Sequence, residues 1–241
     1  MWQGFKSKEF IFEDRKAIIV FPSKTDKEKN WTLKTEYWGA FPETETALLS
    51  KGFHAAYLQN KTRFATKEDC DAKHRFVEFI SRKYNLKSKC VLIGMSCGGA
   101  IAMNFAGLYP DDVACMFLDA PVLNFLSYPG KVGSKECEEV WENEFIKAYP
   151  GITRPKLLDF KNHPINSADT IKKHKIPIIM LYGTEDKTVI YEENGKLMEE
   201  AFEGHNELLK VIPRVYQGHH PHGFLKNSSE ITDFIIAHIR R

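Results

Sequence analysis

Short apolar runs alternate with longer amphipathic segments along most of the chain. The short runs have the length and the β-branched or aromatic content that are typical of strands. They cover residues 16–21, 32–38, 53–58, 90–94, 113–118, 176–182 and 208–214. The runs at 90–94 and 113–118 are continuously apolar, which indicates strands that are buried on both faces.

The longer segments between these strands predict helices. Residues 66–84 carry apolar and aromatic side chains at helical spacing, namely Phe76, Val77, Phe79, Ile80 and Tyr84. Further helices are predicted at 44–51, 98–108, 192–202 and 228–239, the last with Asn227 as its N-cap and Glu230 three residues later. Because strands and helices alternate, the sequence predicts an α/β fold, in which a mostly parallel central sheet carries helices on both faces.

The pattern breaks between residues 121 and 175. This region is interrupted by Pro121, Pro129, Pro150, Pro155 and Pro164, which favour loops and short helices. We expect it to form an insertion, a lid over the C-terminal edge of the sheet, rather than an independent domain. On length alone, 241 residues lie between one large domain and two small ones. We predict a single domain over 1–241 that contains this lid.

Composition excludes several classes of protein. Hydrophobic residues make up 43% of the chain and charged residues 27%, which is a globular balance. A net charge of +2 gives no general attraction to nucleic acid or to an acidic membrane, and no apolar run is long enough for a membrane span. The N-terminus has no apolar signal segment, and the five cysteines are odd in number without CxxC spacing. We therefore expect reduced thiols and a cytoplasmic location.

The strongest chemical signal is the segment Gly94-Met95-Ser96-Cys97-Gly98. It matches the G-x-S-x-G pattern and lies between a predicted buried strand and a helix that is rich in small residues. A nucleophile on such a turn points its oxygen into the site, and small neighbours relieve the crowding. The start of the following helix also favours developing negative charge. Ser96 is therefore the predicted nucleophile.

A serine hydroxyl needs a base and usually an acid, and these follow the serine in the order acid and then histidine on a fold of this kind. Asp186 comes directly after the predicted strand at 176–182 and is the predicted acid. Glu185 beside it and Asp119, which follows the strand at 113–118, are the alternatives.

The base is expected within the segment 218–223, which reads GHHPHG and follows the last predicted strand. His219 is the predicted base, His222 is the alternative, and His220 is the least suitable. We expect no metal site, because adjacent side chains of His-His-x-His diverge and no Cys or further His stands at ligand spacing. The chemistry requires no cofactor.

Acyl transfer also needs donors for the oxyanion. The N–H of Cys97, the residue after the nucleophile, is the expected first donor. The N–H of Ala40, in the turn 38–42 after an early predicted strand, is the expected second donor. The thiol of Cys97 is expected to take no part.

Together these motifs resemble the α/β-hydrolase family over nearly the whole chain. The segments WGAFP at 38–42, KGFH at 51–54, DAPV at 119–122 and GHHPH at 218–222 resemble, more narrowly, a set of bacterial hydrolases described as esterase-like or dienelactone-hydrolase-like.

The resemblance implies a Ser–His–Asp mechanism through an acyl-enzyme. The resemblance does not extend to the substrate, which we expect to be a small-molecule ester, namely a small acyl ester, for which a carbohydrate is one candidate alcohol. A serine peptidase or amidase on the same fold, and a hydrolase-fold protein that binds a ligand without turnover, are the alternatives. The sequence gives no indication of oligomeric state.

Overall fold

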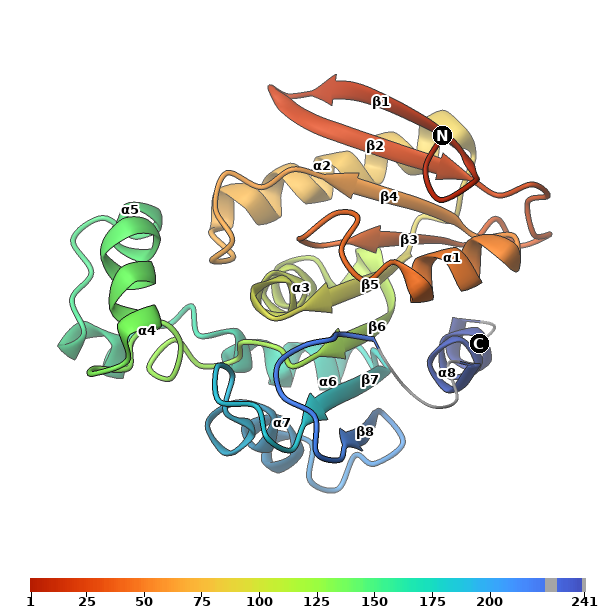
Figure 1. The fold of residues 1–241 in the computed structure, drawn as a ribbon. Coiled ribbons are helices and arrows are strands. Elements are labelled where there is room, and N and C mark those ends of the chain that lie inside the picture. The colour runs from red at the N-terminus through yellow and green to blue at the C-terminus, as the bar shows by residue number, and fades with distance from the viewer. Residues whose placement is uncertain (224–228, 240–241) are drawn as a thin grey trace.

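The computed structural model describes residues 1–223 and 229–239, and these contain one eight-stranded sheet (Figure 1). The order across the sheet is β1-β2-β4-β3-β5-β6-β7-β8. The strands are β1 Lys6–Phe12, β2 Arg15–Phe21, β3 Trp31–Lys34, β4 His54–Leu58, β5 Cys90–Met95, β6 Val113–Asp119, β7 Ile178–Gly183 and β8 Leu209–Arg214. β2 pairs antiparallel with β1 and with β4, and the other pairs are parallel. The predicted α/β class with a mostly parallel sheet is confirmed.

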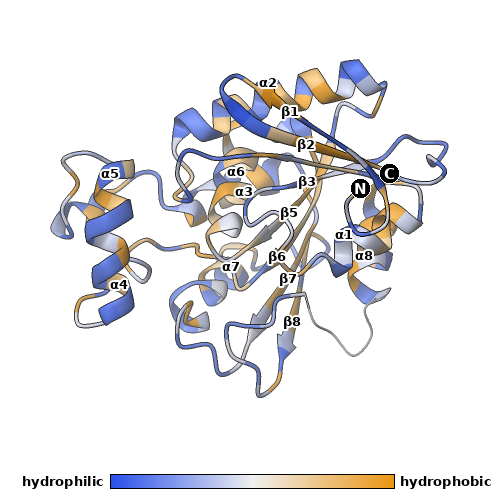
Figure 2. Cartoon of the chain, turned by 45° about the horizontal axis from the view of Figure 1, so that its top comes forward, coloured by the Kyte–Doolittle hydropathy of each residue, from blue (hydrophilic) through white to orange (hydrophobic). Residues whose placement is uncertain are grey.

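Helices cover both faces of the sheet, as predicted (Figures 1 and 2). One face carries α2 Lys67–Tyr84, α3 Cys97–Leu108, α6 Ala168–Lys173 and α7 Gly195–Ala201, and the other carries α1 Glu43–Ser50 and α8 Ser229–Ile239. Leu92 and Met116 point into the core beneath the first set, while Ile93 and Phe117 pack with α1 and α8. This division explains why β5 and β6 are apolar at successive positions.

The parallel strands β5 to β8 end at one edge of the sheet. Met95 pairs with Asp119 across β5 and β6, and Gly183 pairs with Arg214 across β7 and β8. The loops that follow these residues therefore start side by side. Such an edge is where open α/β sheets bind ligands.

Several predicted elements differ from the structure. The strand predicted at 32–38 ends at Lys34, because Tyr37, Gly39 and Phe41 take positive φ values and turn the chain away from the sheet. The helix predicted at 192–202 is divided into a 3-10 turn at Tyr191–Glu193 and α7. β1 was not predicted, since none of its residues is fully buried and it has no continuous apolar run. The predicted cap Asn227, with Ser228, lies outside the described residues.

Residues 121–167 form a group of short elements, here called the insert, part of which stands apart from the sheet in Figure 1. The insert contains α4 Lys135–Val140, a π-helical turn at Trp141–Phe145, α5 Ile146–Ala148 and 3-10 turns at Pro155–Asp159 and Pro164–Ser167. Its aromatic residues share a core with Phe64 and Cys97. The expected insertion ran to residue 175, but α6 packs on α3 and the main core, so that residues 168–173 belong to the helical layer.

A further 3-10 turn at Pro110–Asp112 connects α3 to β6. Within residues 1–223 and 229–239, no helix combines the length and the apolarity that crossing a membrane requires.

Candidate active site

Ser96 lies on the sharp turn from β5 into α3. Its φ of 52° and ψ of −123° form a backbone conformation that L-residues rarely adopt and that is concentrated at functional sites. The turn is crowded, since a Cβ at Gly94 would lie 2.6 Å from the carbonyl oxygen of Gly98. A Cβ at Gly99 would lie 2.3 Å from the Cβ of Pro121. Glycine at 94 and 99 therefore allows the backbone to approach closely enough to present Ser96.

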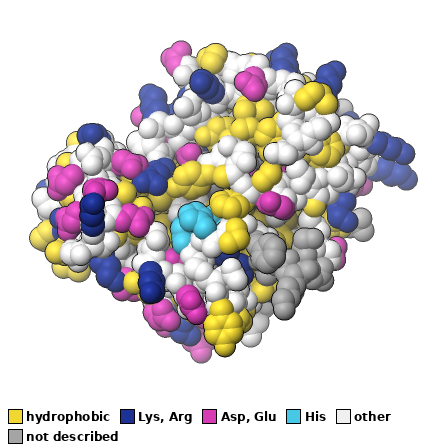
Figure 3. Space-filling view, in the orientation of Figure 1, with side chains coloured by type: hydrophobic (Ala, Val, Ile, Leu, Met, Phe, Trp, Pro, Cys, Tyr) yellow, Lys and Arg dark blue, Asp and Glu magenta, His cyan; other side chains and the backbone are white. Residues whose placement is uncertain are grey.

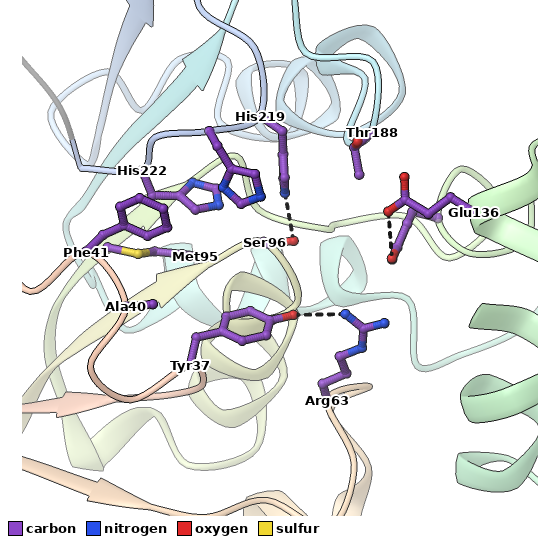
Figure 4. Close-up of a pocket in the computed structure, with 12 residues that line it drawn as sticks. Tyr37, Ala40, Phe41, Arg63, Met95, Ser96, Glu136, Thr188, His219 and His222 are labelled. Carbon is purple, nitrogen blue, oxygen red and sulfur yellow. Dashed lines mark hydrogen bonds between the residues drawn. The ribbon is translucent and has the colours of Figure 1, made fainter. Parts of the chain in front are cut away.

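Asp186 and His219 reach Ser96 from the loops after β7 and β8. His219 Nε2 lies 3.1 Å from Ser96 Oγ, the contact that is dashed in Figure 4. The other ring nitrogen, His219 Nδ1, lies 2.7 Å from Asp186 Oδ2. The side chains that the sequence analysis selected as nucleophile, base and acid thus form one continuous chain of contacts.

The carboxylate of Asp186 is buried and anchored. Its side chain is 1% exposed, and its Oδ1 accepts hydrogen bonds of 2.9 Å from the N–H groups of Thr188 and Val189. Burial raises the pKa of Asp186, but the His219 ring and the two amides lower it, and the net shift is below the ordinary value. Asp186 is therefore ionised at neutral pH and can fix the orientation of His219. The alternative acid, Glu185, is exposed.

Asp119, the other alternative acid, is paired with an arginine. Its Oδ1 lies 2.8 Å from Arg214 Nη2, and both side chains are almost completely buried. Its Oδ2 accepts the N–H of Gly223 and lies 3.6 Å from Nδ1 of His222. Arg214 also donates to the carbonyl of Pro221. The pair thus holds both ends of the segment 221–223 and fixes the loop that carries His219.

A cavity of about 430 Å³ opens in front of Ser96. Figure 3 shows histidine at a hollow of the surface, with hydrophobic side chains next to it. The lining residues are Tyr37, Ala40, Phe41, Arg63, Met95, Ser96, Tyr128, Glu136, Thr188, His219, His220 and His222 (Figure 4). The loop after β3, the insert and the loop after β8, which carries His219, His220 and His222, all contribute. The cavity is therefore formed by segments far apart in the sequence.

The end of the cavity near the insert is polar. Arg63 forms two contacts of 2.7 Å with the carboxylate of Glu144, through Nε and Nη2. Its Nη1 lies 3.4 Å from the hydroxyl of Tyr37, and the hydroxyl of Tyr128 lies 3.3 Å from Glu136 Oε1. The sequence analysis assigned no role to these side chains, because they belong to loops without a recognisable motif and meet only in the folded chain.

A family model described as alpha/beta hydrolase fold matches residues 66–135, which include Ser96. Solved structures match nearly the whole chain. Acylaminoacyl peptidase of Pyrococcus horikoshii is 13% identical with a TM-score of 0.74, over 98% of this chain and 42% of its own. Est1E of Butyrivibrio proteoclasticus is 14% identical with a TM-score of 0.68, over 98% of this chain and 99% of its own. The chain has the α/β-hydrolase fold.

A third relative of the same fold is dipeptidyl peptidase 4 of Porphyromonas gingivalis, at 13% identity and a TM-score of 0.70, over 99% of this chain and 36% of its own. The chain therefore spans less than half of the length of the two peptidases. No curated protein sequence matches it significantly.

In α/β-hydrolases the oxyanion is bound by the N–H of the residue after the serine and by a donor from an early loop. Cys97 is the first residue of α3, so its N–H has no partner within the helix. Its thiol is fully buried, and burial raises the pKa of Cys97 to about 11, which keeps it protonated. The N–H of Ala40 instead donates to the carbonyl of Tyr37 at 3.0 Å and closes a turn. The predicted role of Ala40 is therefore wrong, because its donor is already engaged.

Tyr37 carries a donor that the sequence analysis missed. Its hydroxyl lines the cavity and points toward the space below Ser96 in Figure 4. Because Arg63 Nη1 donates to the phenolic oxygen, the proton of Tyr37 is directed to another acceptor, and the side chain of Cys97, next to Ser96, is also within hydrogen-bonding reach of this hydroxyl. Burial raises the pKa of Tyr37 far above its ordinary value, so the group remains a neutral donor. The positive φ values in the loop after β3 direct this side chain to the site.

Proposed function

We propose that the protein is a serine hydrolase that cleaves a small carboxylic ester. The observation that carries the proposal is the chain of contacts from Asp186 Oδ2 through both nitrogens of His219 to Ser96 Oγ, at 2.7 and 3.1 Å. Both distances are within the range in which a base can take a proton from a nucleophile and an acid can orient the base.

The mechanism begins with the transfer of the Ser96 proton to His219 Nε2 as Ser96 Oγ attacks the ester carbonyl carbon. The N–H of Cys97 and the hydroxyl of Tyr37 bind the oxyanion, and each such donor contributes about 3–4 kcal/mol to the barrier reduction. His219 then protonates the leaving alcohol, which releases it and leaves an acyl group on Ser96. Asp186 stabilises the imidazolium and holds its tautomer throughout.

Deacylation repeats these steps with water. His219 takes a proton from the water, whose oxygen attacks the acyl carbon, and the oxyanion returns to the same donors. Collapse of this intermediate breaks the bond to Ser96 Oγ, which regains its proton from His219. The products are a carboxylic acid and the regenerated serine.

The cavity supports a small substrate. Its volume of about 430 Å³ is in the lower part of the range for ligand sites, which is about 300–1,000 Å³. Phe41 and Met95 supply apolar walls, while the contacts of Arg63 and Glu136 make the end near the insert polar. We infer a short acyl or alcohol group that carries a polar substituent, and a lid-like role for the insert that closes this end.

Hydrolysis of p-nitrophenyl acetate and butyrate by the wild type and by Ser96→Ala tests the proposal. We expect the wild type to release p-nitrophenol and Ser96→Ala to lose the activity, with a melting temperature within a few degrees of the wild type. Equal hydrolysis by both proteins would refute Ser96 as the nucleophile.

Amide hydrolysis is the second candidate, because two of the structural relatives are named peptidases. The same site chemistry serves both reactions, and the difference lies in how the leaving group is bound. Peptide anilides assayed beside the aryl esters, with kcat/KM compared for equal acyl groups, distinguish the two. A higher kcat/KM for the anilides would replace the ester proposal.

A further inference from the structure

The three histidines of the segment 219–222 form a compact cluster beside Ser96. The ring centroids of His219, His220 and His222 are all 4.8 Å apart, and their planes cross at 67° to 82°. One ligand nitrogen from each ring lies within 4.8 Å of the other two. The divergence of adjacent side chains that we expected from the sequence is therefore contradicted, because the rings of His219 and His220 lie 4.8 Å apart and His222 packs at the same distance from both.

Two of these rings offer nitrogens suited to a metal ion. His219 Nδ1 contacts Asp186, and His222 Nδ1 lies 3.6 Å from Asp119 and has no hydrogen-bond partner among residues 1–223 and 229–239. A carboxylate at one ring nitrogen fixes the tautomer in which the other nitrogen carries a lone pair, and this arrangement is common behind zinc-bound imidazoles. In His219 the nitrogen that remains is Nε2, whereas His222 offers its buried and unpartnered Nδ1.

The fixed charges behind the cluster favour a cation. Asp119 and Asp186 contribute two negative charges, and Arg214 contributes one positive charge, so that the side chains directly behind the rings carry a net negative charge. The third ring, His220, is exposed and gives access from solvent. A tetrahedral zinc holds nitrogens at about 2.0–2.1 Å, hence roughly 3.4 Å from one another. The exposed His220 ring stacks on Phe41 with centroids 5.7 Å apart, so zinc binding requires this ring to move from Phe41 toward the other two.

We propose that His219, His220 and His222 bind one Zn²⁺ ion through imidazole nitrogens, and that this ion reversibly inhibits the enzyme. Imidazole ligands suit zinc and copper rather than magnesium or calcium. A nitrogen that donates its lone pair to zinc cannot accept the proton of Ser96, so zinc and the Ser96–His219 contact exclude each other. The inhibitory part of this inference rests on the proposed hydrolase function, whereas the binding part does not.

Calorimetric titration with ZnCl₂ of the wild type, His220→Ala and His205→Ala tests the binding. His205 is the matched control, since it is an exposed histidine outside the cluster. We expect one zinc per wild-type chain, at least tenfold weaker binding to His220→Ala, and wild-type binding to His205→Ala. The five cysteines are buried and offer zinc no exposed thiol. No zinc binding by the wild type, or equal binding by the wild type and His220→Ala, would overturn the proposal.

The inhibitory part is tested with p-nitrophenyl acetate over the same range of ZnCl₂, and each rate is divided by the zinc-free rate of the same protein. We expect inhibition of the wild type that EDTA reverses, and an inhibition curve displaced at least tenfold for His220→Ala. Zinc that binds at the cluster without slowing hydrolysis would overturn the inhibitory part. A wild type without any esterase activity would refute the proposed function, and the calorimetric result would still decide the binding part.

Discussion

Two acid–histidine pairs lie side by side at the carboxyl edge of the sheet, and only one of them reaches Ser96. Asp186 lies 2.7 Å from His219, whereas Asp119 lies 3.6 Å from His222. The difference comes from Arg214, which neutralises Asp119, whereas Asp186 contacts His219 and two backbone amides. A carboxylate that is already paired with a cation gives little electrostatic stabilisation to an imidazolium. We infer that Asp186 supports the reaction and that Asp119 supports the loop.

Replacing each histidine by alanine should produce the largest difference in kcat between the two pairs. His219→Ala removes the proposed base and should lower kcat by about 10⁵–10⁶-fold, as loss of a triad histidine does elsewhere. His222→Ala removes a ring from the same loop and should lower kcat far less, once it is corrected for the folded fraction. The measurement is kcat for p-nitrophenyl acetate. The reverse order would make His222 the base.

Exchanging the acids should separate catalysis from stability. Asp186→Asn should lower kcat by about 10⁴-fold, because the amide favours the wrong tautomer of His219. Asp119→Asn leaves Arg214 buried without its counter-charge, which should cost about 3–5 kcal/mol of unfolding free energy.

Urea unfolding measures the loss of stability in each aspartate variant, and kcat per folded molecule measures the loss of catalysis. Asp119→Leu combined with Arg214→Met, which removes both charges together, should recover part of the lost stability. If Asp119→Asn lowers kcat of the folded protein as much as Asp186→Asn does, the division of roles fails.

Tyr37→Phe tests a smaller effect on the same site. Loss of one oxyanion donor should lower kcat by about 10²–10³-fold with little change in KM. Tyr128→Phe is the matched control, since this tyrosine lines the same cavity and its hydroxyl contacts Glu136. We expect Tyr128→Phe to alter KM more than kcat. An unchanged kcat for Tyr37→Phe would assign the second donor to a backbone amide of the loop.

The smallest expected effect is on stability in acid. The pKa of Asp186 is lowered from 3.8, so its charged form is favoured in the native state. Its contribution to stability is complete above the ordinary pKa and is lost as the pH falls through the lower native value. The difference in unfolding free energy between wild type and Asp186→Asn should therefore shrink from about pH 5 to about pH 2. Asp233→Asn, an exposed exchange, should show no such change. A constant difference for Asp186→Asn would contradict the assigned pKa direction.

Local pattern was sufficient for much of the fold and for the proposed triad. The continuous apolar runs of β5 and β6 predict buried parallel strands, and carboxyl ends of parallel strands meet at one edge. Ser96, Asp186 and His219 each follow such a strand, so their order along the chain predicts their proximity. The turn at Ser96 is specified by adjacent glycines and is therefore visible in the sequence.

The features that the sequence did not predict depend on contacts between distant segments or on backbone angles. The pairing of Asp119 with Arg214 joins residues that are 95 positions apart in the sequence, and no local motif at either residue predicts the contact. The oxyanion donor in the loop after β3 was predicted wrongly, because Tyr37 and Phe41 take positive φ values that their residue types do not suggest. That geometry engages the amide of Ala40 and brings Tyr37 to the cavity instead.

We propose that Ser96 is activated by His219 rather than by His222. The most direct test is the rate at which a fluorophosphonate labels the wild type, His219→Ala and His222→Ala, with the modified residue identified by mass spectrometry. This reagent needs an activated serine but no knowledge of the substrate. We expect an adduct on Ser96 that forms rapidly in the wild type and in His222→Ala and very slowly in His219→Ala. An adduct on another residue, or slow labelling of His222→Ala with rapid labelling of His219→Ala, would contradict it.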